Sequence, residues 1–158
     1  MTEKRKEAAA FLCRYRDYEK DLNSIREQMF VIQQLLRTIE KQESEKASAP
    51  AVQKRLDRFR KQQTELRDTL RMQHALMTAG KQYIEQILLS LPEKERNVLR
   101  RYYVMGDFHH AADDLMEELG YEKSQIYRLR DKGLDKVSRR LDESKSFLDV
   151  LSQQKTTE

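Results

Sequence analysis

Residues 3–43 contain neither glycine nor proline, and their large apolar side chains recur alternately four and three positions apart. The members of this stripe are Phe11, Tyr15, Tyr18, Leu22, Ile25, Met29, Ile32, Leu36 and Ile39. A heptad repeat of this length predicts one long helix whose apolar face must be covered by another helix. Leu12, Val31 and Leu35 widen the stripe, so the helix is expected to bury more than a two-stranded seam.

A second long helix is predicted from about Ala51 to Ser90, after a turn in the small, polar segment 44–50. Its stripe consists of Val52, Leu56, Phe59, Gln63, Leu66, Leu70, Gln73, Met77, Ile84, Ile87 and Leu91. Two helices of similar length joined by a short turn predict an antiparallel, coiled-coil-like hairpin. Gly80 weakens the second helix by about 1 kcal/mol relative to alanine and is a candidate hinge.

Residues 91–141 carry the main functional signal, because their charge is sharply divided. Residues 107–122 contain six acidic side chains and no lysine or arginine, whereas residues 123–140 contain seven basic side chains against Asp131 and Asp135. Such an acidic helix followed by a basic one, joined at Gly120, is typical of a helix-turn-helix. The second helix approaches phosphates, and the first holds it without doing so.

The apolar pattern of this region predicts three short helices. Pro92 suits the first turn of the first helix, and Gly106 suits its end. Asp107 is predicted to cap the next helix, which either starts there or follows an intervening loop. The residues expected to point inward are Val98, Leu99, Tyr102 and Tyr103, then Ala111, Ala112, Leu115, Met116 and Leu119, and finally Ile126, Leu129, Leu134 and Val137.

The segments LPEKERNVLRRYY and DLMEELGYEKSQIYRLRDKGLDKV resemble region four of the sigma-70 family, the part that reads the −35 promoter element. They also resemble the DNA-binding half of ArpU-type late-gene regulators from phages of Gram-positive bacteria. The resemblance covers about a third of the chain. It implies a sequence-specific DNA-binding transcription regulator whose recognition helix, over about 123–137, lies in the major groove.

In the family, the outward residues at the start of the recognition helix touch bases. By position these are Lys123, Ser124, Gln125, Tyr127 and Arg128, and Lys132 on the same basic helix completes the candidate DNA-binding set. The chain departs from the family at Glu122, where a serine or threonine is usual. The stretch from Gly106 to Leu115 is also about one helical turn longer than the usual spacing.

The whole chain is therefore expected to be all-α, with a long helical hairpin over residues 1–90 and a helix-turn-helix domain over residues 91–158. The hairpin is expected to serve self-association or contact with RNA polymerase. The 158 residues are 38% hydrophobic and 37% charged, which suits long exposed helices. Their net charge of +4 is compatible with double-stranded DNA as a partner. A single cysteine, no membrane-spanning run and no signal-peptide core predict a cytoplasmic protein.

Two interpretations of the chain remain open. The first is the DNA-binding regulator, and the second is a helical adaptor that binds RNA polymerase or a sigma factor without reading DNA. An enzyme, a cofactor and a metal are not predicted, because no glycine-rich phosphate loop, metal cluster or activated nucleophile is evident. His109 and His110 precede Asp113 and Asp114 by four positions, and this spacing favours ordinary capping or pairing over a metal site. The basic run at residues 54–61 favours a solvated helix face over a second phosphate contact.

Overall fold

The computed structural model describes residues 1–45, 49–106 and 108–156. Its elements in chain order are α1 (Glu3–Glu45), α2 (Pro50–Leu89), α3 (Glu93–Leu99), the π-helical turn η1 (Arg100–Val104), α4 (Ala111–Leu119) and α5 (Lys123–Thr156). No strand occurs in these ranges, so the predicted all-α class is confirmed. Among the residues that the structure describes, no helix combines the length and the apolar character that crossing a bilayer requires.

The chain forms two compact units that do not coincide with a division at residue 90. One, the composite unit, contains Met1–Asp17 and Lys81–Glu158, and the other, the hairpin unit, contains Tyr18–Gly80. The start of α1 belongs to the composite unit because its side chains contact later helices. Phe11 packs edge-on against the ring of Tyr83, with the ring centroids 5.6 Å apart.

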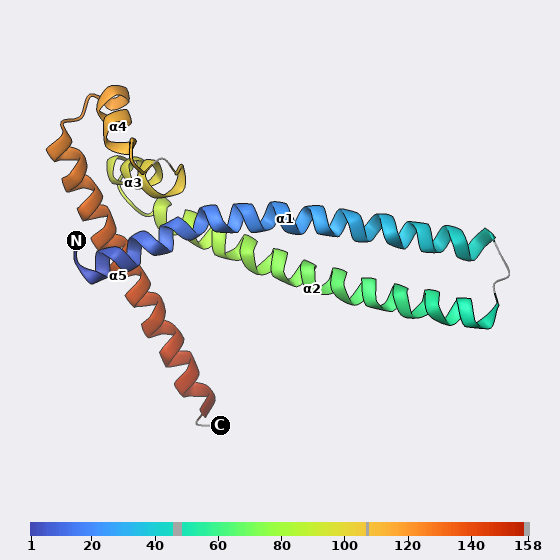
Figure 1. Ribbon diagram of the computed structural model, residues 1–158. Helices are drawn as coiled ribbons and strands as arrows, with labels where there is room; N and C mark the ends of the chain where they lie inside the picture. Colours follow the sequence, from blue (N-terminus) through green and yellow to red (C-terminus); the bar gives the residue numbers. More distant parts are fainter. Residues whose placement is uncertain (46–48, 107, 157–158) are drawn as a thin grey trace. The chain divides into compact units, whose positions relative to one another are not determined.

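The hairpin unit consists of two helix segments that lie side by side and run in opposite directions (Figure 1). Its core contains Ile25 and Ile32 of α1 with Leu70 of α2, and half-buried Met29, Leu36 and Met77 pack against it. The heptad stripe of α1 is buried or half-buried along its length, as predicted. Within the stripe's predicted widening, Leu12 is fully buried in the composite unit, whereas Val31 and Leu35 are exposed.

The face that α2 presents to α1 in the hairpin unit differs from the predicted one. Four residues of the predicted stripe are exposed, namely Val52, Phe59, Leu66 and Gln73. Arg60, Arg67 and His74 are half-buried instead, at intervals of seven. Arginine can line such a seam because its aliphatic stem packs while its guanidinium group reaches water or a carboxylate. Arg60 accordingly forms an ion pair with Glu43 of α1.

Gly80 is the last residue of the hairpin unit, and α2 runs through it without a break. A Cβ atom at this position would lie 2.9 Å from Cε2 of Tyr18. The absence of a side chain therefore lets the Tyr18 ring lie directly against the α2 backbone.

The composite unit holds most of the fully buried side chains. The largest of them are Leu12, Ile84, Leu88, Val98, Leu99, Ile126, Leu134 and Val137. Helix α5 passes close to α3, and a Cβ atom on Gly133 would lie 2.8 Å from Cδ1 of Leu99. Helix α5 is also one continuous helix from Lys123 to Thr156.

Helix α4 is shorter than predicted and buries a narrower face. It begins at Ala111 after a turn at residues 108–110, so a loop intervenes, and the predicted cap Asp107 lies outside the described residues. Ala111 and Leu115 are buried, whereas the predictions for Met116 and Leu119 were wrong, since these side chains are 38% and 41% exposed. Helix α4 has nine residues and packs along one narrow face, so it buries only side chains that are four positions apart, such as Ala111 and Leu115.

Candidate nucleic-acid interface

Helices α4 and α5 are joined by a three-residue turn at residues 120–122 (Figure 1). Gly120 has a φ of 68°, a left-handed conformation that glycine adopts without steric cost, and its N–H donates to the carbonyl of Met116 at 3.1 Å. The N–H of Ile126 donates to the Glu122 carbonyl at 3.1 Å. These bonds fix where α4 ends and where α5 begins.

The first two turns of α5 present the predicted polar residues to solvent. Ile126 is fully buried and therefore fixes the rotation of the helix about its axis. Lys123, Ser124 and Arg128 are exposed, in agreement with the sequence analysis, whereas Gln125 is half-buried. Leu129 is also only half-buried, so the inner face of this part of α5 is narrower than predicted.

Tyr127 lies between two cations on the surface of α5. The Lys123 Nζ atom is 5.9 Å and the Arg130 Cζ atom is 5.0 Å from the centroid of its ring. Arg130 also lies over the ring of Tyr102, at 5.6 Å. Tyr127 remains 37% exposed, so its ring positions these cations and still has a free edge.

Arg128 and Lys132 carry uncompensated positive charge on this surface. Both side chains are exposed, and neither forms an ion pair with any residue that the structure describes. Their spacing of four places them on one face of α5. Two adjacent guanidinium and ammonium groups without partners are suited to bind an anion such as a phosphate.

The two acidic residues of this part of α5 are both paired. Arg5 from α1 forms two hydrogen bonds with Asp135, at 2.8 and 2.9 Å, and lies 3.6 Å from Asp131. The hydrogen bond from Arg5 lowers the pKa of the Asp135 carboxyl group. Asp131 also accepts hydrogen bonds from Arg130 at 3.2 Å. This pairing leaves the outward face of α5 with a net positive charge.

Arg5 was not singled out from the sequence. The only signal for it is the basic run Lys4, Arg5 and Lys6 at the start of α1, which by itself indicates a solvated helix end. Its role depends on a contact with a residue 130 positions away.

Ion pairs attach the neighbouring helices to α5 and to each other. Lys136 binds both oxygens of Glu95 in α3, at 2.8 and 3.0 Å, and Glu95 is only 5% exposed. Arg100 makes a two-bond contact with Glu85 at 2.9 and 3.1 Å. These contacts pair Glu95 of α3 with Lys136 and, between η1 and α2, Arg100 with Glu85.

The acidic surface of α4 is only partly neutralised. Arg101 of η1 lies 3.5 Å from Asp114 and 2.5 Å from Glu118. Asp113 and Glu117 are exposed and form no ion pair within the described ranges. Glu122 is exposed too, and its side chain makes no hydrogen bond to the residues described. It therefore does not cap α5 through its carboxylate, and its negative charge remains at the start of the helix.

The two adjacent tyrosines of η1 belong to the core, as predicted. Tyr102 is 5% and Tyr103 is 3% exposed. The hydroxyl group of Tyr103 is buried and has no hydrogen-bond partner among the described residues. Burial raises the pKa of Tyr103 to about 12.

No group of three or more histidine, cysteine, aspartate or glutamate side chains in the described part of the chain is arranged to hold a metal ion. Comparisons of the chain with protein-family models, with curated proteins and with solved structures found no match.

Proposed function

We propose that the chain is a sequence-specific DNA-binding transcription regulator and that residues 123–137 of α5 enter the major groove. The observation that carries this proposal is the unpaired charge of Arg128 and Lys132 beside two carboxylates that are both paired. The resemblance of residues 91–141 to sigma-70 region four and to ArpU-type regulators supports the same assignment. The hairpin serves self-association or contact with RNA polymerase.

Individual side chains take different parts in the proposed contact. Lys123 and Ser124 lie at the start of α5, where free backbone N–H groups and the helix dipole favour a phosphate. Arg128, one turn further along, is suited to a guanine edge, and Gln125 to an adenine edge. Half-burial of Gln125 restricts it to a base pair that lies close to the helix surface.

The test begins with selection from random DNA duplexes at two salt concentrations, followed by titration of two variants on the selected site. Lys123→Ala should weaken binding to all sequences and reduce the salt slope by about one unit. Arg128→Ala should cost about 1–3 kcal/mol on the preferred site and relax the choice of base at one position.

The matched control is Arg58→Ala, which removes one exposed arginine from α2. It should leave base preference unchanged. If Arg128→Ala alters neither affinity, salt slope nor base preference, α5 does not read DNA.

The second candidate function is a helical adaptor that binds RNA polymerase or a sigma factor without reading DNA. It is favoured by the exposed acids Asp113 and Glu117 on α4 and Glu122 just before α5, because negative charges repel phosphate. If the chain binds RNA polymerase or a sigma factor, and this binding persists when salt is raised from about 50 to about 300 mM, the result would favour the adaptor over the regulator.

A further inference from the structure

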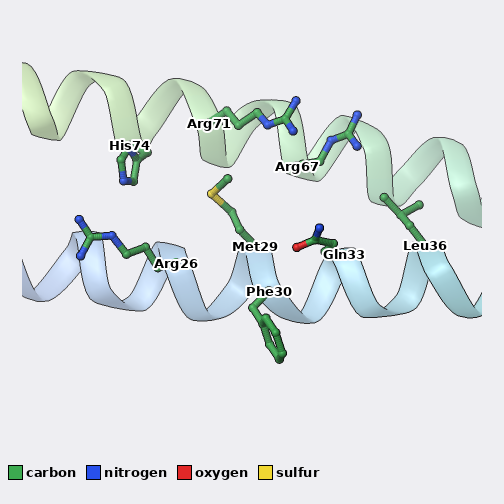
Figure 2. A pocket seen from close by; sticks show the side chains of 8 residues that line it. All are labelled: Arg26, Met29, Phe30, Gln33, Leu36, Arg67, Arg71 and His74. Atoms are coloured by element: carbon green, nitrogen blue, oxygen red, sulfur yellow. The ribbon is translucent and has the colours of Figure 1, made fainter.

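The hairpin unit contains a groove of about 480 Å³ between α1 and α2 (Figure 2). Its lining residues are Arg26, Met29, Phe30, Gln33 and Leu36 of α1 and Arg67, Arg71 and His74 of α2. The set contains three arginines and no acidic residue. Figure 2 shows Met29 and Leu36 reaching toward α2, whereas the Phe30 ring points away from it. Met29 and Leu36 are the apolar floor of the groove, which the three arginines also line.

The arginines of the groove lack acidic partners across it. Arg26 and Arg71 are exposed and form no ion pair with any described residue, and Arg26 donates only to Asn23, at 3.4 Å. The Nε atom of Arg67 is buried without a hydrogen bond in the described part of the chain, and the nearest carboxylate oxygen, on Asp68, is 3.7 Å away. The groove therefore favours an occupant with carboxylates beside apolar side chains.

The shape of the groove indicates that this occupant is a helix. A channel between two antiparallel helices accepts a third helix, whose apolar face lies on the floor between them. The lining on α1 extends from Arg26 to Leu36, and the helical rise between these two residues is about 15 Å. A helix of two to three turns would fill this length.

Helix α4 has these properties. Its nine residues span about 13 Å, and the stretch 107–122 that contains it has six acidic side chains and no basic one. Asp113, Met116 and Glu117 lie on one exposed face at a spacing of three and four, and the two acids are unpaired within the described ranges. The face thus offers one apolar side chain beside two neighbouring carboxylates.

We propose that α4 of a second copy of this chain docks in the groove, with Asp113 and Glu117 facing Arg26 and Arg71 and with Met116 on the apolar floor. The inference names the contact surfaces for the self-association included in the proposed function, and it rests on that part of the proposal alone. Because each copy carries both surfaces, two copies can exchange α4 helices reciprocally or assemble head to tail.

The experiment is sedimentation velocity of the full chain without DNA, at about 10 and about 100 µM. A groove variant carries Arg26→Glu and Arg71→Glu, and an α4 variant carries Asp113→Lys and Glu117→Lys. We expect the wild-type chain to self-associate and each variant to associate at least about tenfold more weakly, because like charges then face each other. An equimolar mixture of the two variants should associate again, since each reversed surface then meets its complement.

The matched control reverses Arg55 and Arg58, two exposed arginines of α2 outside the groove, and should leave association unchanged. Circular dichroism establishes that every variant retains its helices. A monomeric wild-type chain, association that survives both reversals, loss in the groove variant alone, or a folded mixture that stays monomeric would each overturn the proposal. Because no DNA is present, these results are independent of whether Arg128→Ala affects DNA binding.

Discussion

Tyr103 carries a hydroxyl group that the packing of η1 buries without supplying a partner from the described residues. A buried polar group without a hydrogen bond lowers stability, because it has lost its bonds to water. The same burial keeps the phenol protonated, with a pKa of about 12 against an ordinary value of 10.0.

Tyr103→Phe should therefore raise the free energy of unfolding at pH 7 by about 1 kcal/mol, measured by urea denaturation. Between pH 10 and about pH 12 the unfolded wild-type chain loses a proton that the folded chain keeps, so stability falls as pH rises through this window. The Y103F variant should lack the part of this loss of stability that comes from the Tyr103 hydroxyl group. Tyr83→Phe is the control with the opposite sign, because the Tyr83 hydroxyl group lies 2.5 Å from that of Ser144. Destabilisation by Tyr103→Phe at pH 7 would mean that its hydroxyl group is bonded in solution.

At the scale of the element, α5 depends on contacts with three other helices. Arg5 of α1 binds Asp135, Glu95 of α3 binds Lys136, and Tyr83 of α2 approaches Ser144. Each contact lies on the part of α5 that follows the first two turns. The start of the helix, with Arg128, stays free to approach a ligand.

The ion pair between Arg5 of α1 and Asp135 of α5 should stabilise the folded chain in a pH-dependent way. The pKa of Asp135 is lowered from its ordinary value of 3.8, chiefly by the hydrogen bond from Arg5. The stabilisation is therefore fully present above about pH 4 and is lost as pH falls through the lowered value. The free energy of unfolding, measured with urea, should fall less between pH 7 and about pH 3 for Asp135→Asn than for the wild-type chain. Asp21→Asn, at an exposed acid of α1, should leave the loss unchanged, and an equal loss in D135N and wild type would contradict the prediction.

The long helices were predictable because glycine and proline are nearly absent from them and the apolar residues keep a heptad spacing. The bounds of α1 and α2 agree with the predicted ranges within two residues. The inner face of α2 was not predictable in the same way. Apolar periodicity counts Arg60 and Arg67 as outward residues, whereas both are half-buried in the structure. An arginine can lie in such a seam because its aliphatic stem tolerates burial.

Part of the candidate site was predictable from the sequence, and part of it was not. The exposure of Lys123, Ser124, Arg128 and Lys132 follows from the position of Ile126, which the sequence pattern identified as inward. The pairing of Asp131 and Asp135 with Arg5 was not predictable, because no local pattern relates residues so far apart in the chain. Local periodicity therefore gave the outward face of α5, and tertiary contacts determined its net charge.

At the scale of the whole molecule, the composite unit joins the two ends of the chain. Fully buried Leu12 comes from α1, and Ile84 and Leu88 come from the end of α2. Lys81 Nζ lies 5.0 Å from the centroid of the Tyr15 ring, so the two points at which the chain leaves and re-enters this unit are close together. The unit therefore has the contacts of a domain that folds without residues 18–80.

A chain in which a short glycine–serine linker joins residues 1–17 to residues 81–158 should fold cooperatively, as followed by thermal denaturation. A fragment of residues 91–158 should be much less stable, because it lacks Leu12, Ile84 and Leu88, each worth roughly 1.5–3 kcal/mol when buried. Equal melting temperatures for the two would show that α1 and α2 contribute nothing to this unit.

The composite nature of this unit also affects the order of events during synthesis. Arg5 leaves the ribosome 130 residues before Asp135, its partner in the folded chain. All residues of the hairpin unit are made in between, and this unit needs no later residue for its Ile25, Ile32 and Leu70 core. Folding of the hairpin unit on the ribosome would shorten the effective loop between the two ends of the composite unit and lower the entropic cost of closing it.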